Sequence, residues 1–269
     1  MSLVPLRQLC SGPLPALLAL CLLVSGPALA ELSPQDVPKL LADMDEAQRR
    51  GGYIKAVFTM VRKEKDKPDV AREGLMYGRD EKKDLKLLIL FTRPKTEQGS
   101  GYLRLDNNLW SYDPRVGRWE RRTDRDRIAG SDSVREDYEA PQYTQRYDVT
   151  YEGDAAVGSF TTHKLLLKAK AGTTVTFPMK RLWVDVKTRN VVMIEDYALS
   201  GRLMRTAYYP KWLKGYSESK KGDVWFPQQM IFEDKMEQNT RTLVTVQGME
   251  LGPIEPNVFT KAFLEGKSR

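Results

Sequence analysis

The chain has 269 residues, a formal net charge of +7, one histidine and two cysteines. Both cysteines, Cys10 and Cys21, precede residue 31, so the remainder has no disulfide, no thiol nucleophile and no cysteine ligand for zinc. A single histidine also excludes metal sites that need two imidazoles. Basic residues are spread along the chain without a dense run, and we therefore expect no nucleic-acid partner.

The first 30 residues have the three parts of a secretory signal peptide. Arg7 is their only charged residue, an apolar run follows over residues 14–24, and the small-x-small triplet 28–30 ends the segment before Glu31. The apolar run is shorter than the roughly 20 residues that a membrane-spanning helix needs. We therefore expect export and cleavage after Ala30.

Cys21 offers a second cleavage position, that of a lipoprotein signal. Such a signal requires a small residue before the cysteine, and Leu20 does not meet this requirement. We therefore expect no lipidation at Cys21. The expected mature protein, residues 31–269, shows no linker or repeat and is predicted to be a single domain.

The mature chain is predicted to open with a helix. Ser33 suits the N-cap and Pro34 the first turn, although Pro38 also allows a start there. Gly51 and Gly52 would end the helix. Its apolar stripe at helical spacing consists of Val37, Leu40, Leu41, Met44 and Ala47.

After Gly52 the apolar period becomes two, which is typical of strands. Strands are predicted over residues 53–61, 85–91, 102–105, 109–112, 163–168, 177–186, 191–199, 203–209, 224–233 and 240–247. Short turns separate them and no long helix intervenes, so we expect an antiparallel sheet built of hairpins. The end of the chain, residues 253–263, is predicted to be a loop with one helical turn.

Residues 121–140 differ from the rest, because they are polar and rich in alternating charges. Ser131 to Ser133 could cap a short helix through Tyr138 that lies over the sheet. A solvated surface loop explains the same composition, and the sequence leaves both interpretations open.

Few residues suggest catalysis. His163 opens a strand beside Lys164, and we interpret it as a surface or hydrogen-bonded histidine, because nothing supplies the geometry of a triad. Glycoside hydrolysis would need a pair of acids. Its candidates on or beside strands, which no spacing favours, are Asp84, Asp106, Asp185, Glu195 and Asp196. Acids that alternate with apolar residues usually form the solvated face of a sheet, so we expect no catalytic site, no metal site and no cofactor.

The apolar faces of the strands are the remaining candidate site. By strand parity, the predicted ligand-binding residues are Ile54, Phe58, Met60, Leu87, Ile89, Leu165, Leu167, Leu182, Val184, Met204, Met230 and Phe232. A sheet with one apolar face must cover it with a second sheet, helices or a ligand. A hydrophobic cavity and a fully packed core fit this pattern equally.

Several short segments, in this order, resemble the LolA-like outer-membrane lipoprotein-sorting proteins, in particular the larger branch of the LolA/LolB superfamily. They are Phe91–Pro94 with Gly99, Asn108–Pro114, Gly130–Asp132 with Glu136–Asp137, Tyr151–Gly153, Trp183–Asp185 with Thr188, and Gly201–Leu203. One position departs from the branch, because Ser133 stands where an aromatic residue usually follows Gly-Ser-Asp.

The resemblance implies a mainly β fold: a half-open, strongly bent antiparallel β-barrel with a few helices forming a lid. It further implies a monomeric periplasmic carrier, not an enzyme, that binds the acyl chains of a lipoprotein or lipid in a hydrophobic cavity. An inner-membrane transporter would be the donor and an outer-membrane protein the acceptor. The alternative on the same fold is a periplasmic sensor or regulatory module that binds a protein partner.

Overall fold

The computed structural model describes residues 32–49, 51–81, 84–105, 108–237 and 239–267. The predicted leader, residues 1–30, lies outside these ranges together with Cys10 and Cys21. Export, cleavage after Ala30 and the absence of lipidation therefore stay predictions. Within the described ranges, no helix is both long and apolar enough to cross a bilayer.

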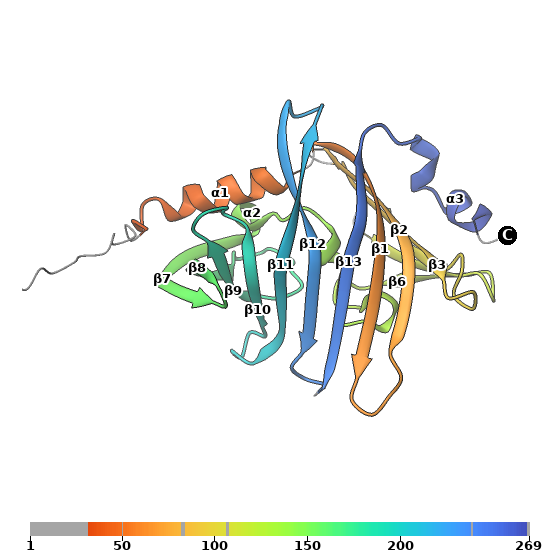
Figure 1. Ribbon diagram of the computed structural model, residues 1–269, viewed down its shortest axis with the longest axis horizontal. Helices are drawn as coiled ribbons and strands as arrows, with labels where there is room; N and C mark the ends of the chain where they lie inside the picture. Colours follow the sequence, from red (N-terminus) through yellow and green to blue (C-terminus); the bar gives the residue numbers. More distant parts are fainter. Residues whose placement is uncertain (1–31, 50, 82–83, 106–107, 238, 268–269) are drawn as a thin grey trace, which may run out of the picture. The chain divides into compact units, whose positions relative to one another are not determined.

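A single antiparallel sheet dominates the described part of the chain, where it has 13 strands (Figure 1). The strands are β1 (Gly52–Glu64), β2 (Val70–Glu81), β3 (Asp84–Arg93), β4 (Gly101–Leu105), β5 (Asn108–Asp113), β6 (Arg118–Arg122), β7 (Tyr147–Val157), β8 (Phe160–Ala169), β9 (Met179–Asp185), β10 (Val191–Tyr197), β11 (Leu203–Ser217), β12 (Gly222–Asp234) and β13 (Thr240–Leu251). All ten predicted strands correspond to strands of this sheet.

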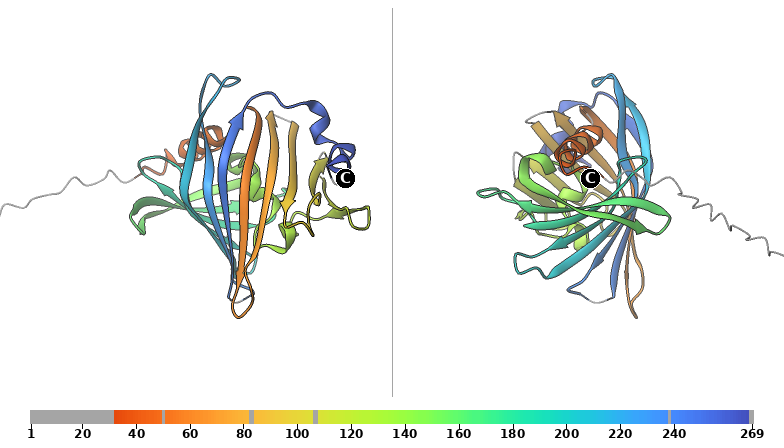
Figure 2. Two further views of the ribbon diagram at one scale, coloured as in Figure 1. Left: turned by 45° about the vertical axis from the view of Figure 1, so that its right-hand side comes forward. Right: turned by 90° about the vertical axis from the view of Figure 1, so that its left-hand side faces the viewer.

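The pairing order leaves the barrel open on one side. Strands adjacent in the chain pair with each other, except β6 with β7, and β1 also pairs with β13. The edges of the described sheet are therefore β6 and β7. Figure 2 shows the strong bend that this sheet adopts. The predicted fold class, a half-open and strongly bent antiparallel barrel, is confirmed.

Helix α1 (Val37–Gln48) lies across one face of the sheet (Figure 1). Its predicted apolar stripe is correct, since Val37, Leu40, Leu41 and Met44 are buried. The predicted N-cap was wrong, because Asp36 and not Ser33 precedes the helix. Pro38 falls in the first turn, where its missing N–H leaves no intrahelical hydrogen bond unmade.

The segment between the two edge strands, residues 123–146, is called the cover segment below. It contains two 3-10 turns, η1 (Ile128–Gly130) and η2 (Arg135–Tyr138), and the short helix α2 (Tyr143–Arg146). Because it links β6 to β7, it crosses the open side of the barrel. Ile128 and Tyr138 are buried in the main core, so this segment packs on the sheet and is not a solvated loop. The helix predicted from Ser131 through Tyr138 is reduced to the turn η2.

The two faces of the sheet have separate apolar cores. On β3, Leu87 and Ile89 face the core beneath α1, whereas Leu88 and Leu90 face the opposite side. That second core is covered by the C-terminal residues Val258 and Phe259 of η3 (Pro256–Phe259) and Leu264 of α3 (Lys261–Gly266). The uninterrupted apolar run of β3 is therefore explained by burial on both faces.

Strands β2, β6 and β7 were not predicted from the sequence. In β2, glycine occupies a position facing the main core, and a Cβ at Gly74 would lie 2.8 Å from the ring of Phe58. The small residue makes room for the aromatic ring of the neighbouring strand and at the same time removes the apolar alternation. In β7, which is an edge strand, the acids Asp148, Glu152 and Asp154 occupy the exposed alternate positions, so the period of two is present and was overlooked.

Candidate lipid-binding site

The residues predicted by strand parity gather on one face of the sheet, called the concave face below. Eleven of the twelve are buried in a single core: Ile54, Phe58, Met60, Leu87, Ile89, Leu165, Leu167, Leu182, Val184, Met230 and Phe232. Met204 is the exception, because it is half-buried at the start of β11 beside Arg205. The alternation of residues along the strands therefore predicted correctly that these side chains share one face of the sheet. Ligand binding by them stays a prediction.

Protein side chains fill this concave face in the structure. Val37, Leu40, Leu41 and Met44 of α1 and Ile128 and Tyr138 of the cover segment pack on it. The hollows between the cover segment and the strands have volumes of about 60 and 50 Å³, which is room for a few water molecules. An acyl chain can reach these residues only if part of the cover moves away.

Three acids of the cover segment hold it to the sheet through buried cations. Glu136 accepts a hydrogen bond from Lys180 of β9 at 2.6 Å. Asp137 accepts two from Arg205 of β11, both at 2.7 Å. Glu139 lies 3.1 Å from Arg104 of β4. The side chains of the three cations are at most 6% exposed. Removal of the cover would leave them without these counter-ions, which is costly in an apolar interior.

Asp196 of β10 is a fourth acid in this network, on the sheet side. It accepts hydrogen bonds from Lys180 and Arg205, each at 2.7 Å. Burial alone would raise the pKa of Asp196, but the two cations outweigh burial and hold this pKa below its ordinary value. For Asp137, burial raises the pKa and Arg205 opposes the rise. The network therefore shifts the pKa of the carboxylate on the sheet down and that of the carboxylate on the cover up.

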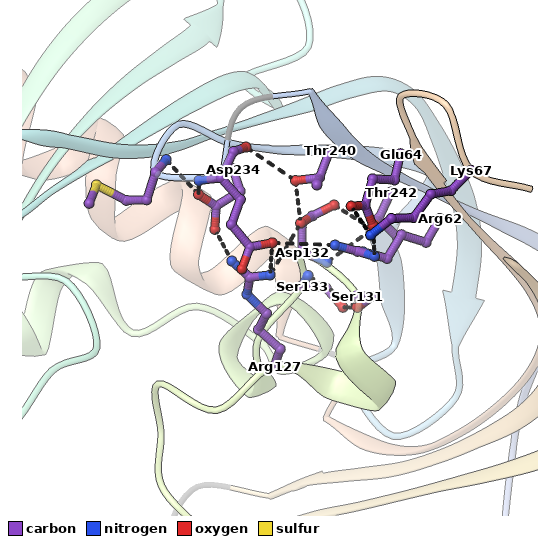
Figure 3. A network of polar contacts seen from close by, with 12 residues as sticks. Arg62, Glu64, Lys67, Arg127, Ser131, Asp132, Ser133, Asp234, Thr240 and Thr242 are labelled. Carbon is purple, nitrogen blue, oxygen red and sulfur yellow. Dashed lines mark hydrogen bonds and ion pairs between the residues drawn. The ribbon is translucent and has the colours of Figure 1, made fainter. Parts of the chain in front are cut away.

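A second polar contact fastens the cover segment at Asp132 (Figure 3). Its carboxylate accepts hydrogen bonds from Thr240 at 3.0 Å and from Thr242 at 2.7 Å, and its backbone N–H donates to Thr242 at 2.9 Å. Arg127 pairs with Asp234 on the neighbouring strand end. Asp132 is thus the residue of the Gly-Ser-Asp motif that docks the cover segment on β13.

Ser133, which departs from the family pattern, is fully buried. Its hydroxyl is 2.7 Å from the hydroxyl of Ser131 and 2.8 Å from that of Tyr138. A small hydrogen-bonded group therefore occupies this position within the cover segment.

Two polar contacts fasten the C-terminal end of helix α1. Asp45 accepts hydrogen bonds from the backbone N–H groups of Tyr143 and Thr144, at 3.0 and 2.8 Å, and so caps the start of α2. Lys220, in the turn between β11 and β12, donates to the carbonyl oxygens of Glu46 and Arg49. These carbonyls belong to the last turn of α1, where a cation is favourable.

The acids weighed for catalysis have structural roles where the structure describes them. Asp185 accepts hydrogen bonds from the backbone N–H and hydroxyl of Thr188, at 2.9 and 2.7 Å, and stabilises a turn. Asp185 and Asp196 are buried, so their assignment to a solvated face was wrong. Asp106 and the side chain of Asp84 lie outside the described residues.

His163 is a hydrogen-bonded histidine, as interpreted from the sequence. Its Nδ1 is 2.6 Å from Asp154, and Tyr151 donates to the same carboxylate. Among the described residues, no group of three or more His, Cys, Asp or Glu side chains is arranged to hold a metal ion.

The buried cations were missed, although the same parity argument could have found them. Lys180 precedes Leu182 by two residues, and Arg205 precedes Ala207 by two, so each shares the concave face with its apolar neighbour. A charged residue in register with a buried apolar face signals a buried ion pair. Its partner in the cover segment could not be identified without the fold.

Comparisons with known proteins agree with this architecture. A protein-family model whose description reads "uncharacterized protein"-like matches residues 83–266, more than half of the chain. Among curated proteins, none matches the sequence.

Solved structures with this fold include three of similar size. A domain of an outer membrane lipoprotein-sorting protein from Vibrio parahaemolyticus has a TM-score of 0.75 at 16% identity, with 87% of this chain and 100% of that chain covered. A DUF1329 family protein from Desulfovibrio piger has a TM-score of 0.74 at 20% identity, with the same coverage. A LolA superfamily protein from Nitrosomonas europaea has a TM-score of 0.68 at 19% identity, with 86% and 99% covered. At these identities, the likeness establishes a shared fold.

Proposed function

The chain belongs to the family of uncharacterized proteins whose model matches residues 83–266, and it shares the fold of outer-membrane lipoprotein-sorting and LolA-superfamily proteins. From this premise we propose that it is a periplasmic carrier. Its concave face receives the acyl chains of a lipoprotein or lipid, which it moves toward the outer membrane. The donor would be an inner-membrane transporter and the acceptor an outer-membrane protein, and the carrier would act as a monomer. No catalytic step is part of this proposal.

The observation that supports it most is the composition of the concave face and its cover. Eleven predicted residues form a continuous apolar surface, and residues from α1 and the cover segment lie on it. Each methylene of an acyl chain that replaces this cover gains about 0.8 kcal/mol on burial. A chain of ordinary length therefore gains enough to compete with the side chains it displaces.

The attachment of the cover segment also suits a carrier, which must release its cargo. The acidic residues Glu136, Asp137 and Glu139 bind cations that stay on the sheet, so the closed state restores three ion pairs at once. A cover that closes by satisfying buried charges favours expulsion of the bound chain. Loading and release then depend on the balance between acyl burial and re-formation of these pairs.

Native mass spectrometry of the mature protein, purified from a membrane-containing host, tests the proposal. We expect co-purified acyl species at a defined stoichiometry, and lipid extraction would identify the cargo class. The same spectrum tests the leader, because the expected chain begins at Glu31. An unloaded mass, together with no uptake of added lipid or lipopeptide, would contradict the carrier and favour a module that binds a protein partner.

A further inference from the structure

An open cleft lies at the seam between the cover segment and the sheet, outside the concave core. Its volume is about 580 Å³, within the range of sites for small molecules. Its apolar lining includes Phe177, Pro178, Ala198, Leu199, Met204 and Met236. Leu199 is 90% exposed and Met236 is 39% exposed, so solvent reaches this apolar surface in the unliganded protein. We call this hollow the seam cleft.

The seam cleft is lined by more arginines than acids. Arg125, Arg127 and Arg205 face two acids, Asp132 and Asp234. Figure 3 shows Arg127 between these two carboxylates, and Arg127 also pairs with Glu237 at 2.9 Å.

Arg205 is buried and bound to Asp137 and Asp196. Arg125 remains: it is exposed, and no carboxylate of the described residues forms a salt bridge with it. The cleft thus offers one uncompensated guanidinium beside an apolar surface.

We propose that the seam cleft binds a single alkyl chain that carries a carboxylate, with the chain on Leu199, Met204 and Met236 and the carboxylate on Arg125. Arg125 is the arginine of this lining that no described carboxylate pairs with, and a guanidinium can bind a carboxylate through two parallel hydrogen bonds. This inference rests on the proposed carrier function, because it identifies the class of amphiphile that first meets the protein.

The position of Phe177 connects the seam cleft to the attachment of the cover. Its ring is 4.9 Å from Nζ of Lys180 and 4.8 Å from the guanidinium carbon of Arg205, measured to the ring centroid. These are the cations that bind Glu136 and Asp137 of the cover segment. A chain in the cleft therefore contacts the group that lies directly under the ion pairs which close the cover.

Binding of dodecanoate and of dodecanol to the mature protein tests the inference, with displacement of a fluorescent fatty acid as the readout. We expect the wild type to bind the acid several-fold more tightly than the alcohol. Arg125→Ser should weaken dodecanoate binding about three- to fivefold, as for an exposed ion pair, and leave dodecanol binding unchanged. The double variant Leu199→Ser with Met236→Ser should weaken the binding of dodecanoate and of dodecanol roughly tenfold, because each ligand loses apolar contact with the cleft.

Arg121→Ser and Val116→Ser are the matched controls, since both residues are exposed and lie outside the seam cleft. Neither should change the affinity for either ligand. Equal affinities for acid and alcohol, or no effect of the Leu199 and Met236 pair, would overturn the inference. Dodecyl phosphate that binds more tightly than dodecanoate would replace the carboxylate assignment by a phosphate.

The two proposals fail separately in these experiments. If native mass spectrometry finds bound acyl lipid while cleft variants bind dodecanoate normally, the seam cleft is wrong and the carrier stands. If no acyl lipid binds the concave face but Arg125→Ser weakens dodecanoate binding, the carrier is wrong and the seam cleft stands.

Discussion

Helix α1 and the cover segment lie on the same concave face, but different interactions attach them to it. Helix α1 contributes four buried apolar side chains, Val37, Leu40, Leu41 and Met44. The cover segment buries Ile128 and Tyr138 there, and in addition Glu136, Asp137, Glu139 and Asp132 are each bound to a polar group of the sheet. Apolar burial stabilises without directional contacts, whereas buried charges stabilise only when every partner is in place. Under the proposed carrier function, residues 123–146 are therefore the part of the cover that we expect to open, and α1 the part that stays in place.

The largest effect is expected from breaking the ionic attachment at its centre. Arg205→Met leaves Asp137 and Asp196 with one buried counter-ion fewer, and we expect a loss of about 3–5 kcal/mol in the free energy of unfolding. Urea unfolding measures this loss. Arg202→Met, an exposed neighbour in sequence, should leave stability within about 0.5 kcal/mol of wild type. Equal stability of the two variants would show that the ion pairs do not hold the cover.

Truncation of the apolar attachment should have a comparable or smaller effect with a different signature. Leu41→Ala removes a fully buried side chain of α1, and we expect a loss of about 2–5 kcal/mol. Because the interaction is apolar, the loss should be the same at low and high salt. The exposed residue Lys39 provides the control variant Lys39→Ala. A strong salt dependence of the Leu41→Ala effect would contradict the distinction between the two attachments.

Acid should weaken the ionic attachment through Asp196. Lys180 and Arg205 overcome the effect of burial and lower the pKa of this carboxyl below 3.8. Such a group stabilises the fold fully above its unfolded pKa, and this contribution is lost as the pH falls through the lower folded pKa. The difference in unfolding free energy between wild type and Asp196→Asn should therefore shrink as the pH falls below 3.8.

Asp137 remains in both proteins of this pair. Burial raises the pKa of Asp137, so its protonation on acidification relieves a cost instead of removing a stabilising contribution. Because Arg205 binds both carboxylates, comparison of the two proteins at each pH reports Asp196 together with its coupling to Asp137. A difference that stays constant from neutral pH to below 3.8 would show that Asp196 is not held ionised by its neighbours.

The smallest effect is expected at the end of α1. Lys220→Met removes the hydrogen bonds to the carbonyl oxygens of Glu46 and Arg49, and we expect a loss of about 0.5–1 kcal/mol. Amide hydrogen exchange in the last turn of α1 should increase together with this loss. Lys221→Met is the control, because the side chain of Lys221 is 76% exposed and pairs only locally with Glu218. Unchanged exchange in α1 would contradict the capping role.

The sequence predicted the parts of this architecture that depend on local period. The apolar stripe of α1 and the buried face of the strands both follow from residue spacing. The sequence did not predict β2, because Gly74 breaks its apolar alternation. Gly74 has to be small since the ring of Phe58 from the neighbouring strand lies against it, and this contact exists only in the folded sheet. Likewise, the acids at Glu136 and Asp137 resemble a solvated loop until the fold brings Lys180 and Arg205 against them. In β2 and in the cover segment, contacts with residues distant in the sequence determine the structure, and local composition does not reveal them.

A disulfide between the cover segment and β13 tests the detachable cover most directly. Residues 31–269 contain no cysteine. The backbone nitrogen of Asp132 lies 2.9 Å from the hydroxyl of Thr242, so the variant Asp132→Cys with Thr242→Cys places two thiols within reach of each other. We predict that the oxidised variant takes up no acyl lipid and that the same protein does so after reduction. Equal uptake in both states would contradict the account, because the concave face would then be loaded without movement of residues 123–146.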